Sequence, residues 1–407
     1  MELAMGAPFQ TALPHKAPPA LVLFALAVGA FAIGTTEFAA MSLLPFFARD
    51  LGIDLPTAGH AISAYALGVV AGAPVIAALG ARLPRRTLLI GLMAMFALAN
   101  GLSALSPSYH WMLLFRFLSG VPHGAYFGVA ALVAANLVPI EQRTLAIAKV
   151  MSGLTVATVI GVPVANWMGQ ALGWRSGFFV VAALAVATMT LVALYAPRDA
   201  GDAKASPMRE LTALGKGQVW LTLLTGAIGF GGLFAVYTYV ASTMMEVTHV
   251  SETYVPFILA IFGIGMTLGN LAVAWLADKA RNRTVIGVLL WSAASLALFP
   301  LMAGNIWTLS LIVFLIGIGG GLGTPLQARL MDVSGDAQTL AAALHHSAFN
   351  VANAIGPWLG GLSIAAGYGL VSTGWIGAAL ALGGLAVFLL AIVLERRGPG
   401  LIPAAAE

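Results

Sequence analysis

The sequence predicts an all-α membrane protein with twelve transmembrane helices arranged as two related six-helix bundles. Three observations predict this fold. The composition is too apolar for a water-soluble domain, twelve segments are long enough to cross a bilayer, and the two halves of the chain resemble each other.

The composition excludes several classes of protein. Of the 407 residues, 60% are hydrophobic and 8% are charged, whereas soluble domains average roughly 25% charged residues. The absence of cysteine excludes disulfides, thiolate catalysis and cysteine-ligated metals. The net charge of +4 is explained by basic loops between spans, so it does not indicate a nucleic-acid partner.

Twelve apolar segments of about 20 residues are each long enough to cross the hydrocarbon core as a helix. They lie near 20–44, 57–79, 87–106, 111–137, 145–170, 175–196, 218–243, 254–277, 284–303, 307–328, 338–364 and 370–394. We therefore expect a cytoplasmic tail (1–19), an N-terminal bundle (20–196), a cytoplasmic linker (197–217), a C-terminal bundle (218–394) and a second tail (395–407).

The basic residues predict the orientation. Sixteen of the 19 Lys and Arg residues fall in the tails, the linker and loops of one side, two fall on the other side, and Arg116 lies within a span. The positive-inside rule then places both termini in the cytoplasm.

The halves resemble each other in sequence. Residues 144–161 align with residues 339–356 at an offset of 195, and at the same offset Gly124 and Gly128 fall on Gly319 and Gly323. Similarity between corresponding spans indicates a duplicated six-helix unit.

Several motifs resemble those of the major facilitator superfamily. LLFRFLSGVPHG has the Arg-x3-Gly pattern of its fourth span, GARLPRRTLL and ADKARNRTV resemble its basic loops, and GPWLGG has the form of its antiporter motif. FAIGTTEFAAMSLLP and RFLSGVPHGAYFGV resemble the drug:proton antiporter-1 type, close to arabinose-efflux (AraJ-type) permeases. Ala81 replaces the usual loop Asp, and the antiporter motif lies in span eleven instead of span five. The resemblance implies alternating access in a bacterial inner membrane, with spans one and four side by side.

Glu37 and Arg116 are ionisable residues inside predicted spans, where charge is costly. By helix rise, Glu37 lies about 12 Å and Arg116 about 8 Å below the outer membrane end. We hypothesise that Glu37 exchanges protons and that Arg116 biases its proton affinity. The alternative is a static ion pair that joins two helices.

His123 and Phe127 share a helix face with Arg116, while Gly120, Gly124 and Gly128 lie on an adjoining face that admits a close neighbour. His123 either relays protons or binds substrate, or it is a neutral side chain hydrogen-bonded to another helix. Pro122 is expected to bend the span.

Polar and aromatic residues within spans are the candidates for substrate binding, with helix packing as the alternative for each. They are Tyr126, Phe127, Asn166, Phe234, Tyr237, Tyr239, His346, Asn350 and Asn353. A cytoplasmic gate of charged contacts is predicted from the basic loops, where topogenic charge is the alternative. Its candidates are Arg82, Arg85, Arg86, Asp278, Arg281, Arg329 and Asp332.

These features together predict a proton-coupled secondary transporter that exports a small organic solute, either a sugar such as an arabinose-like compound or an amphipathic drug. Symport and uniport in the uptake direction are the alternatives, and a channel or membrane enzyme is a different class. No phosphate-binding loop or metal-ligand spacing is present, so we expect no enzyme activity, cofactor, metal or nucleic acid. The expected partners are substrate, protons and the bilayer, and the protein is expected to act as a monomer.

Overall fold

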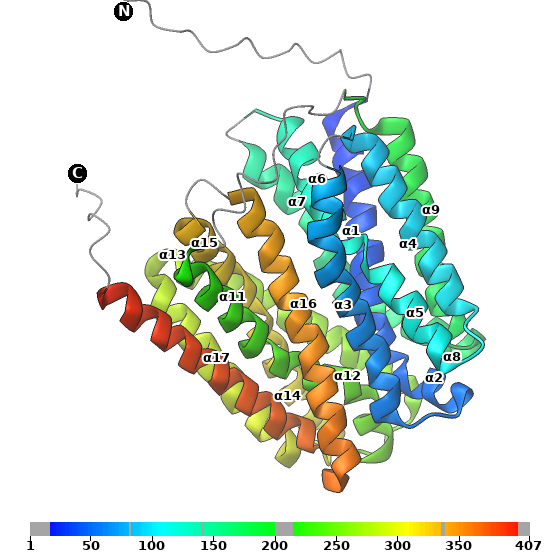
Figure 1. Ribbon diagram of the computed structural model, residues 1–407. Helices are drawn as coiled ribbons and strands as arrows, with labels where there is room; N and C mark the ends of the chain where they lie inside the picture. The colour runs from blue at the N-terminus through cyan, green and yellow to red at the C-terminus, as the bar shows by residue number, and fades with distance from the viewer. Residues whose placement is uncertain (1–16, 81–82, 140–141, 200–214, 335–337, 398–407) are drawn as a thin grey trace, which may run out of the picture.

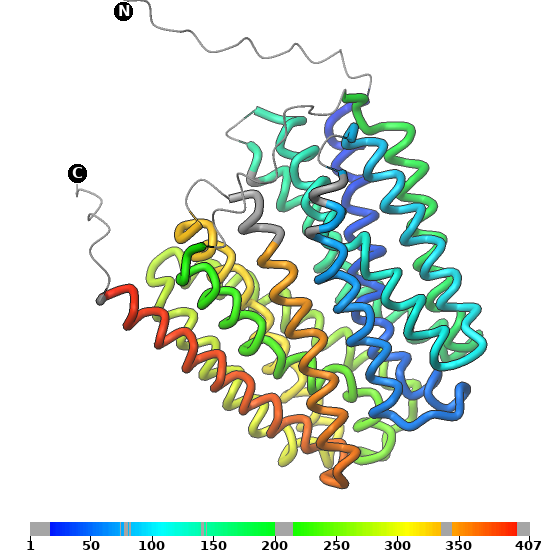
Figure 2. Tube along the Cα trace, in the orientation of Figure 1, coloured from blue at the N-terminus to red at the C-terminus, as the bar shows by residue number. Residues whose placement is uncertain are grey.

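The structure is a computed structural model, described here for residues 17–80, 83–139, 142–199, 215–334 and 338–397. Across these residues it is helical and contains no strand. Figure 1 shows two groups of helices side by side, with α1 to α9 in one and α11 to α17 in the other. The trace in Figure 2 separates the same two groups by colour, blue to green and green to red.

Every predicted span of the first half is helical. The helices are α1 (Pro19–Ser42), α2 (Leu44–Leu51), α3 (Leu55–Gly80), α4 (Arg85–Ala104), α5 (Tyr109–Gly120), α6 (His123–Asn136), α7 (Arg143–Val156), the π-helix η2 (Ala157–Gly161), α8 (Val162–Leu172) and α9 (Arg175–Tyr195). The predicted break in span four is confirmed, since α5 ends and α6 begins on either side of Val121 and Pro122.

Helix α2 lies between the first and second predicted spans, where no helix was expected. Pro45 occupies its first turn, a position where the missing N–H is no loss. Gly52 ends the helix with a positive φ of 64°, a left-handed conformation that favours glycine.

Every predicted span of the second half is also helical. The elements are α11 (Gly217–Gly229), α12 (Gly231–Glu246), the short η4 (Glu252–Tyr254), α13 (Val255–Met302), α14 (Ile306–Ile318), η5 (Gly319–Leu322), α15 (Gly323–Ser334), α16 (Gln338–Ser363), η6 (Ile364–Tyr368) and α17 (Ser372–Arg397). Helix α13 contains two predicted spans, and it kinks between them at Ala280, which has non-helical dihedral angles.

By length and composition, nine helical stretches among the described residues are able to cross a membrane. One of them, Glu252–Met302, holds the two spans that the kink in α13 separates. With α3 and α16, these stretches account for the twelve predicted spans.

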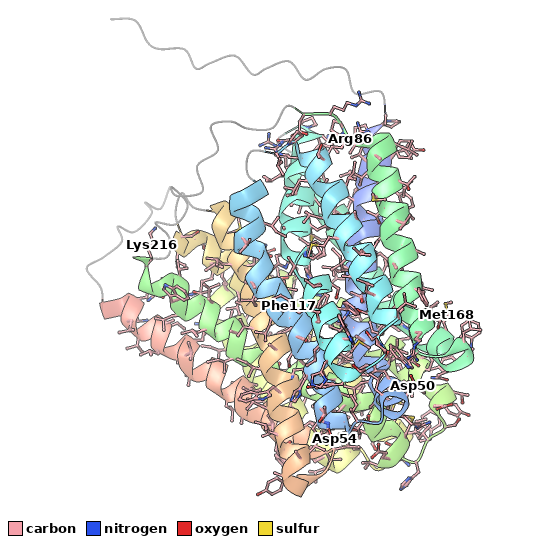
Figure 3. All side chains as sticks on the ribbon, turned by 45° about the vertical axis from the view of Figure 1, so that its right-hand side comes forward. Asp50, Asp54, Arg86, Phe117, Met168 and Lys216 are labelled. Carbon is pink, nitrogen blue, oxygen red and sulfur yellow. The ribbon has the colours of Figure 1, made fainter. Side chains whose placement is uncertain are left out.

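Labelled charged residues mark two opposite ends of the molecule (Figure 3). The start of α1 and the end of α17 lie toward the same end of the bundle (Figure 1). Figure 3 shows Arg86 and Lys216 toward that end, with Asp50 and Asp54 toward the other. We refer to these as the cytoplasmic and outer ends.

Glycines allow α3 and α5 to cross at backbone contact. A Cβ at Gly120 would lie 3.0 Å from backbone atoms of Tyr65 and Val69, so no side chain fits there. In the second half, Gly265 and Gly317 of α13 and α14 approach the partner backbone in the same way as Gly68 and Gly120.

This equivalence corrects the sequence alignment for span four. Gly120 and Gly124 correspond to Gly317 and Gly321, which is an offset of 197, so Gly124 and Gly128 do not correspond to Gly319 and Gly323. The offset of 195 holds for the following span, where Gly34 meets Ala157 and Gly231 meets Ala352. The first half is therefore two residues longer between these spans.

We predict that Gly120→Ala destabilises the protein by about 1–3 kcal/mol, because the added methyl group would overlap the backbone of α3. Gly128→Ala is the matched control, since a Cβ there meets no atom within 4 Å, and it should leave stability unchanged or slightly raised. Thermal unfolding of the detergent-solubilised protein measures both. Equal unfolding midpoints for the two variants would contradict the crossing.

Candidate functional site

Glu37 lies on α1 at the boundary between the two bundles. It is 8% exposed and is the one acidic residue among the buried residues of the described chain. Asn353, on α16 of the other half, donates a hydrogen bond from Nδ2 to Glu37 Oε1 at 3.0 Å. The second polar atom of that amide, Asn353 Oδ1, is buried and has no partner among the described residues. The carboxyl group thus forms part of the contact between the halves.

Arg116 lies on α5 and is 1% exposed. Its Nη1 donates to Thr36 Oγ1 at 3.1 Å, and Thr36 in turn donates to Asn100 Oδ1 at 2.7 Å. The guanidinium carbon lies 4.3 Å from the ring centroid of Tyr65 and 5.5 Å from that of Phe178. Its Nε and Nη2 are buried without partners in the described structure.

The position of Arg116 confirms that spans one and four are adjacent at the depth of Glu37. The static ion pair between Glu37 and Arg116 is not what the structure shows. Among the described residues the ion pairs are those of Arg175, Arg281 and Arg329, and Arg116 reaches Thr36 instead of the neighbouring carboxylate. The aromatic rings that flank the guanidinium offset part of its desolvation.

Tyr65 of α3 connects Arg116 to His123. Its ring lies against the guanidinium, and its hydroxyl is 2.8 Å from His123 Nδ1. The sequence does not predict these contacts of Tyr65, because they depend on the α3–α5 crossing. His123 is 3% exposed and hydrogen-bonded to a neighbouring helix, as one of the two interpretations of this residue expected.

Aromatic rings continue from His123 across the boundary between the halves. The centroids of His123 and Phe127 are 5.2 Å apart, and Phe127 stacks on His346 of α16 at 5.5 Å with nearly parallel planes. Nearer the outer end, Phe38 of α1 contacts Phe234 and Tyr237 of α12. Four of the substrate candidates, with Asn353 as the fifth, therefore lie at this boundary.

Three other substrate candidates connect helices through backbone carbonyls. Tyr126 donates to Leu26 O at 2.8 Å, Asn166 to Ser42 O at 3.0 Å and Tyr239 to Pro357 O at 2.9 Å. Their polar atoms are engaged in helix packing, which was the alternative interpretation. Asn350 donates to His346 O, and its Oδ1 is buried without a partner in the described chain.

The second half carries no counterpart of this polar site. At the structural offset of 197, the positions of Glu37, Tyr65 and Arg116 correspond to Phe234, Phe262 and Val313. All three of these residues are buried in the apolar core. The described structure also holds no group of three or more side chains suited to a metal ion. Glu37 and Arg116 therefore have no ionisable counterpart at the equivalent positions of the second half.

The outer ends of the helices are held together by hydrogen bonds. Arg175 and Trp174 both donate to Asp50 Oδ2, and these hydrogen bonds hold the pKa of Asp50 below its ordinary value. Between the halves, Gln170 Nε2 donates to the carbonyl of Glu252 at 2.7 Å. Deeper in the bundle, Ser63 of α3 donates to the carbonyl of Ala354 at 2.8 Å. These contacts close the outer side of the boundary.

The predicted gate residues contact their own halves in this conformation. The backbone N–H groups of Arg85 and Arg86 donate to Asp199, and Arg281 pairs with Asp332. Arg329 pairs with Glu395 at 3.0 Å and is also bonded to Gln218 and Asn282. Arg82 lies outside the described residues. A charged gate between the halves stays a prediction for another conformation.

We predict graded effects of substitutions at Tyr65. Tyr65→Phe keeps the ring over Arg116 but leaves His123 Nδ1 unpaired, which should cost about 1–3 kcal/mol. Tyr65→Leu also removes the cation–π contact and should cost a further ~1–2 kcal/mol. Thermal unfolding in detergent measures the series, with exposed Tyr254→Phe as the control. If Tyr65→Leu were no less stable than Tyr65→Phe, the ring would not be compensating the guanidinium.

Comparison with known proteins supports the architecture described above. The family model of the Major Facilitator Superfamily matches residues 26–279 and 223–407. The inner membrane transport protein YdhP of Escherichia coli (strain K12) is 39% identical over 93% of this chain and 96% of its own. The putative transporter AraJ of the same organism is 34% identical over 85% and 88%, and a chloramphenicol resistance protein of Streptomyces lividans is 35% identical over 83% and 87%.

A solved structure has the same fold at low sequence identity. A bacterial homologue of the human lysosomal transporter Spinster superposes with a TM-score of 0.73 and 16% identity, covering 94% of this chain and 99% of that one. Family, fold and relatives agree with the resemblance found in the motifs. The chain belongs to the major facilitator superfamily and is a multi-pass membrane transporter of the bacterial inner membrane, related to efflux-type members and not an enzyme.

Proposed function

We propose that this transporter exports a small organic solute in exchange for protons, and that Glu37 is the group that carries the proton. The observation that carries the proposal is the hydrogen bond from Asn353 to Glu37, because it connects an ionisable group of one half to the other half. Protonation of Glu37 therefore changes the contact between the two bundles directly.

The unpartnered Asn353 Oδ1 supplies the physical link. A carboxylate accepts the amide N–H but offers no proton to Oδ1. A protonated carboxyl group also donates its O–H, so that acid and amide form two parallel hydrogen bonds. Proton binding thus strengthens the contact that closes the outer side, and proton loss leaves a buried charge beside an unsatisfied oxygen.

Arg116 provides the compensating charge within this mechanism. Arg116 forms no ion pair with Glu37 among the described residues and donates instead to Thr36, the residue that precedes Glu37 on α1. Both residues belong to the first bundle, so the guanidinium stays beside Glu37 while the contact with Asn353 of the second bundle forms and breaks. The proton enters from the outer side when that side is open and leaves toward the cytoplasm.

The boundary supplies contacts for a solute of the proposed class. Ring surfaces of Phe38, Phe127 and His346 suit a planar apolar compound or a sugar face. The free N–H groups of Arg116 and the carbonyl oxygen of Asn350 are hydrogen-bonding groups without partners in the described structure. We propose that Phe234 and Tyr237 complete this site, and that bundles 20–196 and 218–394 move as units about it. A monomer is sufficient for this cycle.

We predict that Glu37→Gln abolishes solute transport driven by a pH gradient in proteoliposomes while preserving solute–solute exchange. Glutamine keeps both hydrogen bonds to Asn353 but carries no exchangeable charge, so the carrier would still bind and exchange solute without proton coupling. Uptake of radiolabelled sugars and amphipathic drugs, with and without an imposed gradient, measures both activities.

The control is Glu252→Gln, which removes an exposed acid at the outer end and should leave gradient-driven transport unchanged. Gradient-driven transport by Glu37→Gln at the wild-type rate would overturn the assignment of the proton to Glu37. Loss of exchange as well as of gradient-driven transport would assign Glu37 to solute binding, which also contradicts the proposal.

A further inference from the structure

A cavity of about 460 Å³ lies at the cytoplasmic end of the second bundle, away from the boundary between the halves. It is formed where the kink of α13 meets α15 and α17. Its lining is Ala280, Arg281, Asn282, Arg283, Arg329, Asp332, Val333 and Glu395. The transport site uses none of these residues.

Positive charge exceeds negative charge in this cavity. Two arginines are compensated, because Arg281 pairs with Asp332 and Arg329 pairs with Glu395. Arg283 has no ion-pair partner among the described residues. Arg329 is 5% exposed, and its buried Nε likewise lacks a partner in the described chain. The cavity therefore carries one uncompensated positive charge next to a buried guanidinium.

The backbone adds to this potential. Ala280 interrupts α13 with a φ of −157° and a ψ of 69°, so a new helical segment begins at the cavity and residues 281–283 line it. The positive end of a helix dipole favours an anion at that place. Asn282 Oδ1 accepts a hydrogen bond from Arg329, and no acceptor for the amide N–H groups of Asn282 is found among the described residues.

The depth of the cavity is that of lipid headgroups. Directly before the kink, the Lys279 ammonium lies 3.4 Å from the ring centroid of Trp275, which is 59% exposed. Tryptophan with a neighbouring lysine is typical of the membrane–water interface. Basic cavities between helices at a cytoplasmic interface suit phosphate-bearing headgroups.

We propose that this cavity binds a phosphate group with a net negative charge, from an anionic phospholipid or from free phosphate. Arg283 and Asn282 donate to the phosphate oxygens, and the Arg281 and Arg329 pairs form the walls. The site is independent of proton coupling. It stabilises the kink of α13, which connects two spans of the second bundle.

The test uses the purified full-length protein in detergent and the variant Arg283→Gln. Its matched control is Lys279→Gln, which removes a charge from the same helix without lining the cavity. Native mass spectrometry measures binding of phosphatidylglycerol and phosphatidylcholine, and thermal unfolding compares inorganic phosphate with chloride at equal ionic strength. Unchanged unfolding midpoints without added ligand show that both variants are folded.

We expect phosphatidylglycerol to bind wild type and Lys279→Gln alike, and Arg283→Gln about tenfold more weakly. If inorganic phosphate raises the unfolding midpoint of wild type but not that of Arg283→Gln, the site binds the phosphate group itself. The absence of that rise, with the lipid effect intact, would assign it to the headgroup. Equal weakening by both variants, equal binding of phosphatidylcholine, or no dependence on Arg283 in either arm would overturn the proposal.

Discussion

The hydrogen bond between Glu37 and Asn353 is the interaction on which the account of this transporter depends. It joins the first helix of one bundle to α16 of the other, and it does so through a group that exists in two charge states. Burying the Glu37 carboxyl group costs free energy, and the surrounding contacts offset part of that cost. Thr36, Asn100 and Tyr65 supply polar and aromatic partners for Arg116, the compensating cation.

This interaction joins two halves that share a fold but differ in the residues at equivalent positions. The two halves share the same glycine-lined crossings, with Gly68 and Gly120 in one and Gly265 and Gly317 in the other. In the second half, however, Phe234 and Val313 occupy the positions of Glu37 and Arg116. The first bundle therefore holds Glu37 and Arg116, while the second supplies Asn353 as the partner of Glu37.

Much of the fold could be predicted from the sequence, because a bilayer leaves few choices for backbone hydrogen bonding. Span positions and the bend at Pro122 follow from local pattern. The similar depth of Glu37 and Arg116 follows from helix rise, and the family resemblance implies that their spans are adjacent. The helix Leu44–Leu51 was missed because eight residues between two spans carry little apolar signal. The register of span four was wrong by two residues, because Gly-rich helices align equally well at neighbouring offsets.

The site was harder to predict than the fold. Sequence reasoning selected Asn353 only as one polar residue among many, since its partner is 316 residues away. The sequence likewise does not identify the partners of Tyr65, because a helix crossing brings that residue to Arg116 and His123. Conversely, Tyr126 and Asn166 look like ligand-binding residues in the sequence but connect helices in the structure. A polar residue within a span indicates that it has a buried hydrogen-bonding partner. Only the tertiary contacts show which residue that partner is.

The response of the outer side to pH tests the central claim most directly. The chain has no cysteine, so spin labels on single cysteines at the exposed positions Arg49 and Glu246, one in each half, report the opening without background. Distances from pulsed electron paramagnetic resonance should shift from short to long as the pH rises in the otherwise unaltered protein, because deprotonated Glu37 loses its second bond to Asn353. In the Glu37→Gln background the short distance should persist at every pH. A pH-dependent opening that is the same with and without Glu37 would contradict the account.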